Sequence, residues 1–234
     1  MQASTQINRK HSLNDRYFDK IDSQEKAYWL GFIWADGSIN KTSKRSSGPN
    51  RLRVTQKWQE RAHLETFRDI LGSDYELVRV PHAGGHDTAQ LDVNCRPLCQ
   101  TLEKLGYGPK TVRIHIPDID PSLLRHFMRG YFDGDGGLSL YQQKVRRWTV
   151  NKQEWSITGN AVLMAEMQDI LSRDANTTST VQLKPYKRSP DTKSLRYGKK
   201  DDIRLLYKYL YENATVYLNS KHEKFVEFFS RCAS

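Results

Sequence analysis

Two apolar segments stand out along the chain, and both end in an aspartate followed by a glycine. Residues 24–35 are apolar nearly all round, and residues 121–135 repeat the ending of that segment: Ala35-Asp36-Gly37 in the first and Gly134-Asp135-Gly136 in the second. A helix with apolar side chains on most of its faces must be buried on most sides. The pattern therefore predicts two central helices, each with one acid at its C-terminal end.

Start and stop signals frame these two helices. Asp22 followed by Glu25 has the form of a capping box before the first helix. Asp120 before Pro121 supplies an N-cap and a first-turn proline for the second. Gly37 is expected to end the first helix.

An alternating pattern follows each acid. Within residues 51–56, Leu52 and Val54 share one face and basic or hydroxyl side chains share the other, which is typical of a half-buried strand. The same periodicities predict, in the first half, strands at 38–42, 51–56, 75–80 and 88–94 and helices at 59–71 and 96–105. In the second half they predict strands at 138–144, 148–158, 180–186 and 194–197 and helices at 161–173, 201–212 and 220–231.

The two halves therefore repeat one order of elements. We predict an α+β fold of two αββαββα repeats related by a pseudo-twofold axis, with two antiparallel sheets. The expected domains are an N-terminal arm (1–22), a first repeat (23–113), a linker (114–120) and a second repeat (121–234).

Small residues recur four positions apart in both central helices. Gly31 precedes Ala35, and Gly130 precedes Gly134, so small side chains line one face of each helix. Two such helices can approach closely along a twofold axis. This packing would bring the two terminal aspartates side by side at one end.

Charge indicates a polyanionic partner. The chain has 234 residues, with 37 Lys and Arg against 27 Asp and Glu, and a net charge of +10. Basic surfaces bind nucleic acids because neutralised phosphates release counterions. No apolar run approaches the roughly 20 residues that span a bilayer, and the polar start of the chain is expected to be neither a signal peptide nor an anchor.

Cysteine usage indicates a reducing compartment. The three cysteines, Cys95, Cys99 and Cys232, are few and odd in number, which favours structural thiols in an intracellular protein. We expect a cytoplasmic location, or an organellar one if the chain is encoded in an organelle.

The two aspartates carry the candidate chemistry. A carboxylate at a helix C-terminus faces the negative end of the dipole, and two neighbouring carboxylates repel unless they share protons or bind cations. An Asp-Gly pair is on its own a common helix exit. Two pairs at matching positions in a repeat are more informative, and oxygen ligands alone favour magnesium bridging to substrate phosphates. The expected reaction is phosphodiester hydrolysis.

The two motifs, residues 29–37 (WLGFIWADG) and 128–136 (MRGYFDGDG), resemble the paired signatures of the LAGLIDADG homing endonucleases in their single-chain, two-repeat form. The resemblance extends over essentially the whole chain. It implies a monomeric, site-specific endonuclease that lays two saddle-shaped sheets in the major groove of double-stranded DNA. It also implies a role in intron or intein mobility and dependence on Mg²⁺, with Mn²⁺ or Ca²⁺ as substitutes.

The resemblance also assigns roles by position. It implies that Asp36 and Asp135 are catalytic and bind metal, and that the preceding residues, Ala35 and Gly134, also contribute to the metal site. Two lysines near the scissile phosphates correspond to Lys110 and Lys221, and Gln56 corresponds to a residue that positions water. The counterpart of Gln56 in the second half is Gly159 or Asn160, so the two sites should be asymmetric.

Two residues depart from the family pattern. Trp34 replaces the first acid of the motif, which the second copy keeps as Asp133. Arg129 replaces a small residue, so that the helices cannot pack there through small side chains alone. Neither change removes an implied metal ligand.

The outward faces of the predicted strands form a candidate DNA-reading surface. Arg and Lys suit guanine, Asn and Gln adenine, and Glu the amino group of cytosine. For any single residue, a merely solvated position competes with base contact. Lys184, Lys187, Arg188 and Arg196 are expected to hold phosphates. The remaining candidates are Ser38, Asn40, Thr42, Lys44, Arg51, Arg53, Thr55, Arg79, Ser139, Tyr141, Gln143, Glu154, Ser156 and Thr158.

Three alternative interpretations remain. The scaffold also suits a non-cleaving nucleic-acid-binding relative, either an RNA maturase or a DNA-binding regulator, although such relatives often lose acids that this chain keeps. A different nuclease or phosphotransferase is disfavoured because no HNH-like or phosphate-loop pattern is present. A zinc site is disfavoured because its four candidate ligands have spacings that match no common structural site: His82, His86, Cys95 and Cys99.

Overall fold

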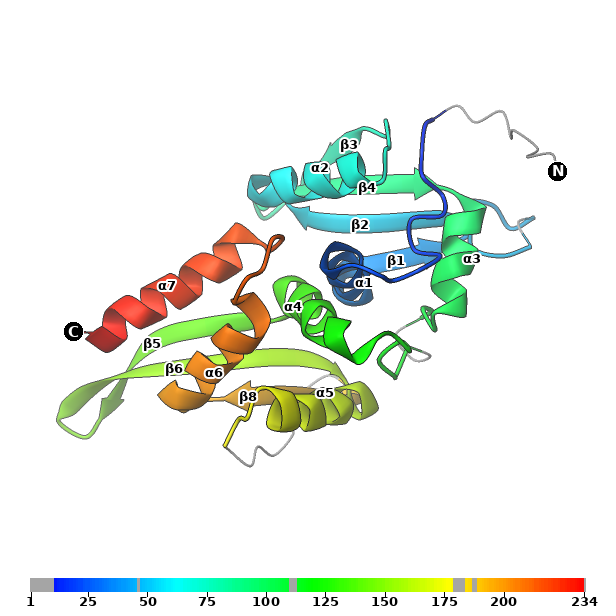
Figure 1. Cartoon of the computed structure of the whole chain (residues 1–234). Helices are drawn as coiled ribbons and strands as arrows, with labels where there is room; N and C mark the ends of the chain where they lie inside the picture. The colour runs from blue at the N-terminus through cyan, green and yellow to red at the C-terminus, as the bar shows by residue number, and fades with distance from the viewer. Residues whose placement is uncertain (1–10, 46, 110–112, 179–183, 187–188, 234) are drawn as a thin grey trace.

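The chain folds into two similar halves that meet along a pair of central helices (Figure 1). The computed structural model describes residues 11–45, 47–109, 113–178, 184–186 and 189–233. The elements of the first half are α1 (Gln24–Asp36), β1 (Gly37–Asn40), β2 (Arg51–Lys57), η1 (Trp58–Glu60), α2 (Arg61–Ile70), β3 (Leu77–Val80), β4 (Thr88–Asn94) and α3 (Arg96–Lys104). Those of the second half are η2 (Pro121–Leu123), α4 (Leu124–Asp135), β5 (Gly137–Val145), β6 (Trp148–Asn160), α5 (Ala161–Asp174), β7 (Lys184–Tyr186), β8 (Ser189–Tyr197), α6 (Lys200–Tyr211) and α7 (Asn219–Ala233).

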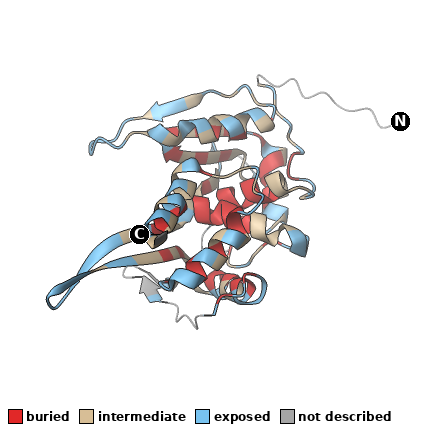
Figure 2. Cartoon of the chain, turned by 60° about the vertical axis from the view of Figure 1, so that its left-hand side comes forward, coloured by how far each residue is buried: buried red, intermediate tan, exposed pale blue. Residues whose placement is uncertain are grey.

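Each half contains a four-stranded antiparallel sheet with the same strand order, β1-β2-β4-β3 in the first and β5-β6-β8-β7 in the second. Helices α1 and α4 lie between the two sheets (Figure 1), and most of their residues are buried (Figure 2). The predicted α+β fold is thereby confirmed. Among the described residues, no helix is long and apolar enough to cross a membrane.

The two central helices touch through their glycines. A Cβ atom added to Gly31 would lie 1.9 Å from the carbonyl oxygen of Phe127 in α4. A Cβ atom added to Gly130 would lie 1.9 Å from the carbonyl oxygen of Tyr28 in α1. The backbones are therefore too close for any side chain at either position, and the predicted close packing of the two helices is confirmed.

Two local predictions were wrong. Ser23, and not Asp22, is the N-cap of α1, because its hydroxyl accepts from the Lys26 backbone N–H. Asp22 instead pairs with the Lys26 ammonium at 2.9 Å. The first strand ends at Asn40, and the expected continuation to residue 42 is a loop in which Thr42 bonds to Asn50.

Gly37 ends α1 for a steric reason and not through a left-handed cap. Its φ of −83° is open to any residue. A Cβ atom there would, however, lie 2.6 Å from the carbonyl oxygen of Ile33. The glycine thus allows the chain to leave the helix directly into β1, and this sharp exit places Asp36 at the boundary between helix and sheet.

Candidate active site

Asp36 and Asp135 are the last residues of α1 and α4, and these two helix ends lie against each other. A Cβ atom added to Gly134 would lie 2.5 Å from Cβ of Ala35 and 3.4 Å from Oδ2 of Asp36. The carboxylate of Asp36 therefore lies against the residue that precedes Asp135.

The charges of Asp36 and Asp135 both affect the pKa values of the same two tyrosines. Burial raises the pKa of Tyr107 to about 12, and the negative charges of both Asp36 and Asp135 add to that rise. Burial also raises the pKa of Tyr131, again with contributions from both aspartates. Both carboxylates thus act on the same two phenols from opposite halves of the chain, as the motif spacing predicts.

Gln56 lies beside the first aspartate. It is buried on β2, and its Nε2 donates to Oδ2 of Asp36 at 2.5 Å. The amide side chain is therefore held at the Asp36 carboxylate.

The second half has a glycine at the position equivalent to Gln56. In the strand registers, Gly37 pairs with Val54, and Gly137 pairs with Ser156. When Asp36 is aligned with Asp135, Gly159 is therefore the position in the second repeat that corresponds to Gln56. A Cβ atom at Gly159 would lie 2.4 Å from the hydroxyl of Tyr131. That hydroxyl donates to the carbonyl oxygen of Thr158 at 2.9 Å. A tyrosine from the helix therefore fills the space that Gln56 occupies in the first half.

The glycine after each acid accepts a hydrogen bond at its backbone carbonyl oxygen, and the donor differs between the two halves. Lys221, which is half-buried near the start of α7, donates from Nζ to the carbonyl oxygen of Gly136. In the first half, the Tyr107 hydroxyl donates to the carbonyl oxygen of Gly37. Burial lowers the pKa of Lys221, while the charges of Asp133, Glu60 and Asp36 oppose this effect. Lys221 thus reaches the site, and the other predicted lysine, Lys110, lies outside the described residues.

Asp133 supports this arrangement from within the interface. It is fully buried and accepts from the hydroxyls of Tyr28 at 2.8 Å and Tyr211 at 2.5 Å, and from the Leu218 N–H at 2.7 Å. The Leu218 carbonyl in turn accepts from the Lys221 N–H at 3.0 Å. Asp133 therefore fixes the start of the helix that carries Lys221.

Burial raises the pKa of Asp133 to about 6, against the opposing effect of its hydrogen-bond donors and of Arg129. Arg129 is also buried, and it donates to the carbonyl oxygens of Val216 and Leu210, each at 2.9 Å. Its guanidinium carbon lies 5.3 Å from the centre of the Tyr28 ring. Asp133 and Arg129 thus belong to one buried polar network across the halves.

Arg113 is a further cation near the site that sequence reasoning missed. It is buried, its Nη1 lies 3.5 Å from the carbonyl oxygen of Ile33, and its guanidinium carbon lies 4.7 Å from the centre of the Tyr107 ring. Its charge lowers the pKa of both Tyr107 and Tyr131 against the larger effect of burial. The only sequence signal was its position three residues beyond the predicted lysine.

The side chains present suit a hard divalent cation. Asp36 and Asp135 offer only oxygen donors, which magnesium prefers, and the charges of both raise the pKa values of the same two tyrosines. Among the described residues, no three His, Cys, Asp or Glu side chains gather as a complete metal cage. The four residues weighed as zinc ligands accordingly form no such cluster.

The strand register confirms the predicted outward face in both sheets. In the first, Ser38 pairs with Arg53, Asn40 with Arg51, and these pairs alternate with buried Leu52 and Val54. In the second, the register places these predicted residues on one face: Ser139, Tyr141, Gln143, Glu154, Ser156, Thr158, Lys184 and Arg196.

Ion pairs hold several of these arginines. Arg53 binds Asp92 through two hydrogen bonds of 2.6 and 2.7 Å, and Arg51 lies 3.7 Å from the same carboxylate. Gln90 also donates to Asp92 at 3.2 Å. Sequence reasoning missed the β4 residues of this face, although their alternation with Leu91 and Val93 would have identified them.

Some predicted DNA-binding residues lie elsewhere. Arg79 pairs with buried Ala89 and therefore points to the helix-covered side of the sheet, where it lies over Trp58 and binds Asp87. Thr42 and Lys44 lie in the β1–β2 loop and not on a strand. Lys187 and Arg188 fall outside the described residues.

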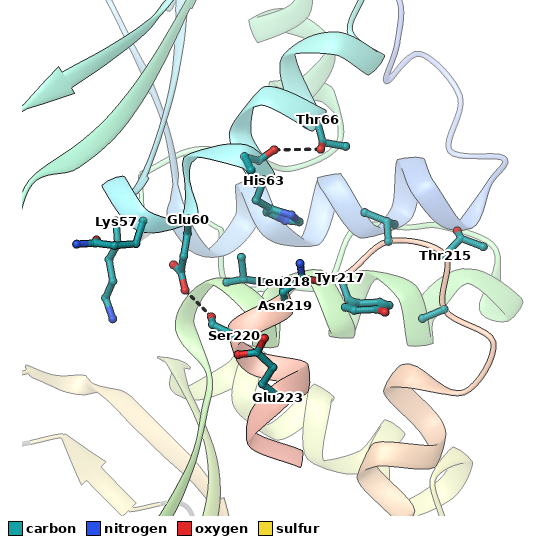
Figure 3. A pocket seen from close by; sticks show the side chains of 14 residues that line it. Lys57, Glu60, His63, Thr66, Thr215, Tyr217, Leu218, Asn219, Ser220 and Glu223 are labelled. Carbon is teal, nitrogen blue, oxygen red and sulfur yellow. Dashed lines mark hydrogen bonds between the residues drawn. The ribbon is translucent and has the colours of Figure 1, made fainter. Parts of the chain in front are cut away.

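A groove of about 750 Å³ follows the seam between the halves (Figure 3). One wall comes from η1 and α2, with Glu60 and His63. The other comes from the segment before α7 and the first turn of that helix, with Tyr217 and Ser220. Ser220 donates to Glu60 across the seam (Figure 3). The groove lies beside the network that holds α7, because the His63 Nε2 atom is 2.7 Å from the Tyr28 hydroxyl.

This fold is that of the LAGLIDADG homing endonucleases. The chain is similar to I-SmaMI bound to an uncleaved DNA target in the presence of calcium ions, with 13% identity, a TM-score of 0.60 and coverage of 90% of each chain. It is also similar to I-AabMI bound to uncleaved DNA, with 11% identity, a TM-score of 0.59 and coverage of 87% of this chain and 88% of that one. I-LtrWI bound to target DNA gives 11% identity, a TM-score of 0.57 and coverage of 94% and 92%.

Sequence comparison adds short matches within larger proteins. The replication factor C small subunit of Methanocaldococcus jannaschii is 28% identical over 132 residues, which cover 53% of this chain and 7% of that protein. The DNA-directed RNA polymerase subunit Rpo1C of the same organism is 25% identical over 162 residues, which cover 68% of this chain and 18% of that protein. The chain thus spans less than a fifth of either relative. No protein-family model matches it.

Proposed function

We propose that the chain is a site-specific endonuclease that hydrolyses both strands of a DNA duplex at a divalent-cation centre held by one aspartate from each repeat. The observation that carries the proposal is the position of Asp36 and Asp135 at the adjoining ends of a closely packed helix pair. The polar outer faces of the two sheets and the fold shared with DNA-bound homing endonucleases support it.

Asp36 and Asp135 are the proposed metal ligands, and oxygens of Ala35 and Gly134 are further candidates. Bound Mg²⁺, or Mn²⁺ or Ca²⁺ in its place, would neutralise phosphate charge and acidify water. Gln56, held at Asp36, would orient a water molecule. Lys221 would stabilise the negative charge that develops on the phosphate, and Lys110 is the candidate for the same role in the first half.

The proposed substrate is one long, partly palindromic duplex site. The outward residues of both sheets would contact bases, and the cations at their margins would contact phosphates. We expect a monomer, since both acids belong to one chain, and an intracellular enzyme, cytoplasmic or organellar. The host element is expected to be a mobile intron or intein.

The test is cleavage of a randomised duplex library with Mg²⁺, followed by assays of the selected site with Asp36→Asn and Asp135→Asn. Each variant should lose cleavage and keep duplex binding, because it removes a metal ligand but no groove contact. Asp118→Asn, which alters an exposed acid in the linker, is the matched control and should cleave normally.

Full cleavage by either active-site variant would contradict the proposal. Duplex binding by the wild type with no cleaved product would favour a DNA-binding regulator, and preferential binding to structured RNA would favour a maturase.

A further inference from the structure

The short helix η1 places one residue of the first repeat against the helix of the second repeat that carries Lys221. Glu60 is the last residue of η1, which follows β2 directly. Its Oε1 accepts from the Ser220 hydroxyl in the first turn of α7 (Figure 3). Lys221 is the next residue of the chain, and its Nζ donates to the carbonyl oxygen of Gly136. A hydrogen bond from the first repeat therefore ends beside the cation that reaches the second motif.

This hydrogen bond crosses the groove between the halves. The groove, of about 750 Å³, lies between η1 and α2 on one side and the start of α7 on the other. Among the described residues that line it, Ser220 and Glu60 form the one hydrogen bond that joins the two walls. Hydrogen bonds to an ionised carboxylate are roughly twice as strong as those between neutral groups. On this side of the seam, the position of the α7 start therefore depends on the Glu60 carboxylate.

The second repeat holds the same helix start from the interior. Asp133 in α4 accepts from the Leu218 N–H at 2.7 Å, and the Leu218 carbonyl accepts from the Lys221 N–H at 3.0 Å. Lys221 is thus anchored from both repeats, by Asp133 through Leu218 and by Glu60 through Ser220.

The charge of Glu60 acts on the lysine as well. Burial lowers the pKa of Lys221, and the negative charges of Asp133, Glu60 and Asp36 oppose that effect, whereas the charge of Lys57 adds to it. Glu60 therefore favours the charged form of the side chain whose helix it anchors.

The end of β2 connects Glu60 with the first motif acid. Gln56, which donates to Asp36, lies four residues before Glu60. The position that corresponds to Glu60 in the second repeat, four residues after Gly159, is Leu163, which is buried and apolar. An apolar side chain accepts no hydrogen bond, so this anchor runs from the first repeat to the second and has no counterpart at that position.

We propose that Glu60 is a positioning residue for the second active centre: it acts from the first repeat and anchors the start of α7 through Ser220, so that Lys221 reaches the scissile phosphate. The inference rests on the proposed function and adds a residue to it. Cleavage of the strand served by Lys221 then depends on Glu60, and cleavage of the other strand does not. A purely structural role in the seam would affect both strands alike.

The test measures single-turnover cleavage of each strand of the selected duplex, with strand-specific end labels. Lys221→Met identifies the strand that depends on the lysine. Glu60→Ala and Ser220→Ala should each slow that strand about tenfold, as expected for the loss of a hydrogen bond to a charged acceptor. The other strand should be cleaved at nearly the wild-type rate, and the dissociation constant for the duplex should not rise.

Three further variants separate positioning from a general loss of structure. Ser220→Thr keeps the hydroxyl and should keep the wild-type rate on both strands. Glu60→Ala/Ser220→Ala should be no slower than either single variant, because all three lose the same bond. Glu223→Ala removes an exposed carboxylate that lines the same groove one turn along α7. It is the matched control and should cleave both strands as the wild type does.

Equal slowing of the two strands in Glu60→Ala, or slow cleavage by Ser220→Thr, would overturn the positioning role. Losses that multiply in the double variant would also overturn it, because they would show that the two residues act independently. Failure of the wild type to cleave any duplex, or unchanged cleavage of both strands by Lys221→Met, would instead contradict the proposed function and its assignment of the lysine.

Discussion

The two halves share a fold and a motif acid but surround that acid differently. The Gln56 amide contacts Asp36, whereas the equivalent position in the second half is Gly159, where the Tyr131 hydroxyl fills the space. The carbonyl after the acid accepts from a tyrosine hydroxyl in the first half and from the Lys221 ammonium in the second.

The duplicated fold requires the same residues where the two central helices touch, but it allows the residues around the two acids to differ. The glycines at the helix seam have matching contacts of 1.9 Å in both halves, because either side chain would collide with backbone. The groups around the acids face no such constraint and have diverged. We therefore expect symmetric effects of mutation at the seam and unequal effects around the two motif acids.

The largest expected effect is at the seam. Gly31→Ala and Gly130→Ala should each destabilise the protein by at least about 3 kcal/mol, since backbone must move to admit the methyl group. Denaturant unfolding would measure this. Gly48→Ala, where nothing lies within 4 Å of the added Cβ atom, should be near neutral. A clear difference between the losses of unfolding free energy in Gly31→Ala and Gly130→Ala would contradict the expected symmetry of the seam.

The next effect concerns Lys221 and Tyr107, which donate to the backbone carbonyl oxygens of the glycines after the two acids. Lys221→Met should slow cleavage of one strand about 100-fold, the usual cost of removing an electrostatic donor. Tyr107→Phe removes only an uncharged hydroxyl and should slow cleavage less than tenfold. Strand-specific end labels would measure both rates. Equal losses in the two variants would show that the cation has no role beyond that of a hydrogen-bond donor.

A smaller and more selective effect is expected at Gln56. Gln56→Ala should slow hydrolysis of one strand by about 10-fold or more, in the range typical of a positioned catalytic group, and leave the other nearly unchanged. With a supercoiled plasmid that carries the target site as the substrate, the nicked circle should then accumulate, which gel electrophoresis would measure. Similar slowing of both strands would contradict a local role at Asp36.

The smallest effect is a pH dependence of stability. Burial lowers the pKa of His63 to about 4, below its ordinary value of about 6.5. The unfolded chain therefore binds the proton more readily, and stability is lost as pH falls below about 6.5. Asp133 acts in the opposite direction because its pKa is raised.

Comparison with His63→Gln isolates the histidine from this opposing effect. Between pH 7 and 5.5, the wild type should lose about 1 kcal/mol more stability than the variant, as measured by denaturant unfolding at both pH values. Parallel pH profiles would contradict this prediction, because they would show that His63 binds its proton equally well in the folded and the unfolded chain.

Sequence periodicity predicted the central helices and the sheet faces because each depends on neighbours a few residues apart. Leu52 and Val54 are buried and their neighbours are not, as strand alternation requires. The Asp133 network could not be predicted in this way. Its bond to Leu218 joins residues 85 positions apart, and its bond to Tyr28 spans 105.

The substitute for Gln56 was equally inaccessible to sequence reasoning. The sequence narrowed the counterpart to Gly159 or Asn160, but strand register was needed to choose Gly159. That Tyr131 fills the vacant volume depends on the distance between a helix and a strand, which no local pattern encodes. The boundary of the β1 strand failed for a related reason, since Thr42 bonds to Asn50 across a loop.

If the outward sheet faces bind DNA as proposed, the Arg53–Asp92 pair limits how this protein can acquire new target sequences. Replacing Arg53 alone would leave the Asp92 carboxylate facing the negatively charged DNA, and replacing Asp92 alone would release a cation able to hold any phosphate. Recognition at this position should therefore change through paired substitutions. Libraries for retargeting would gain more from varying Arg53 and Asp92 together than from scanning either position singly.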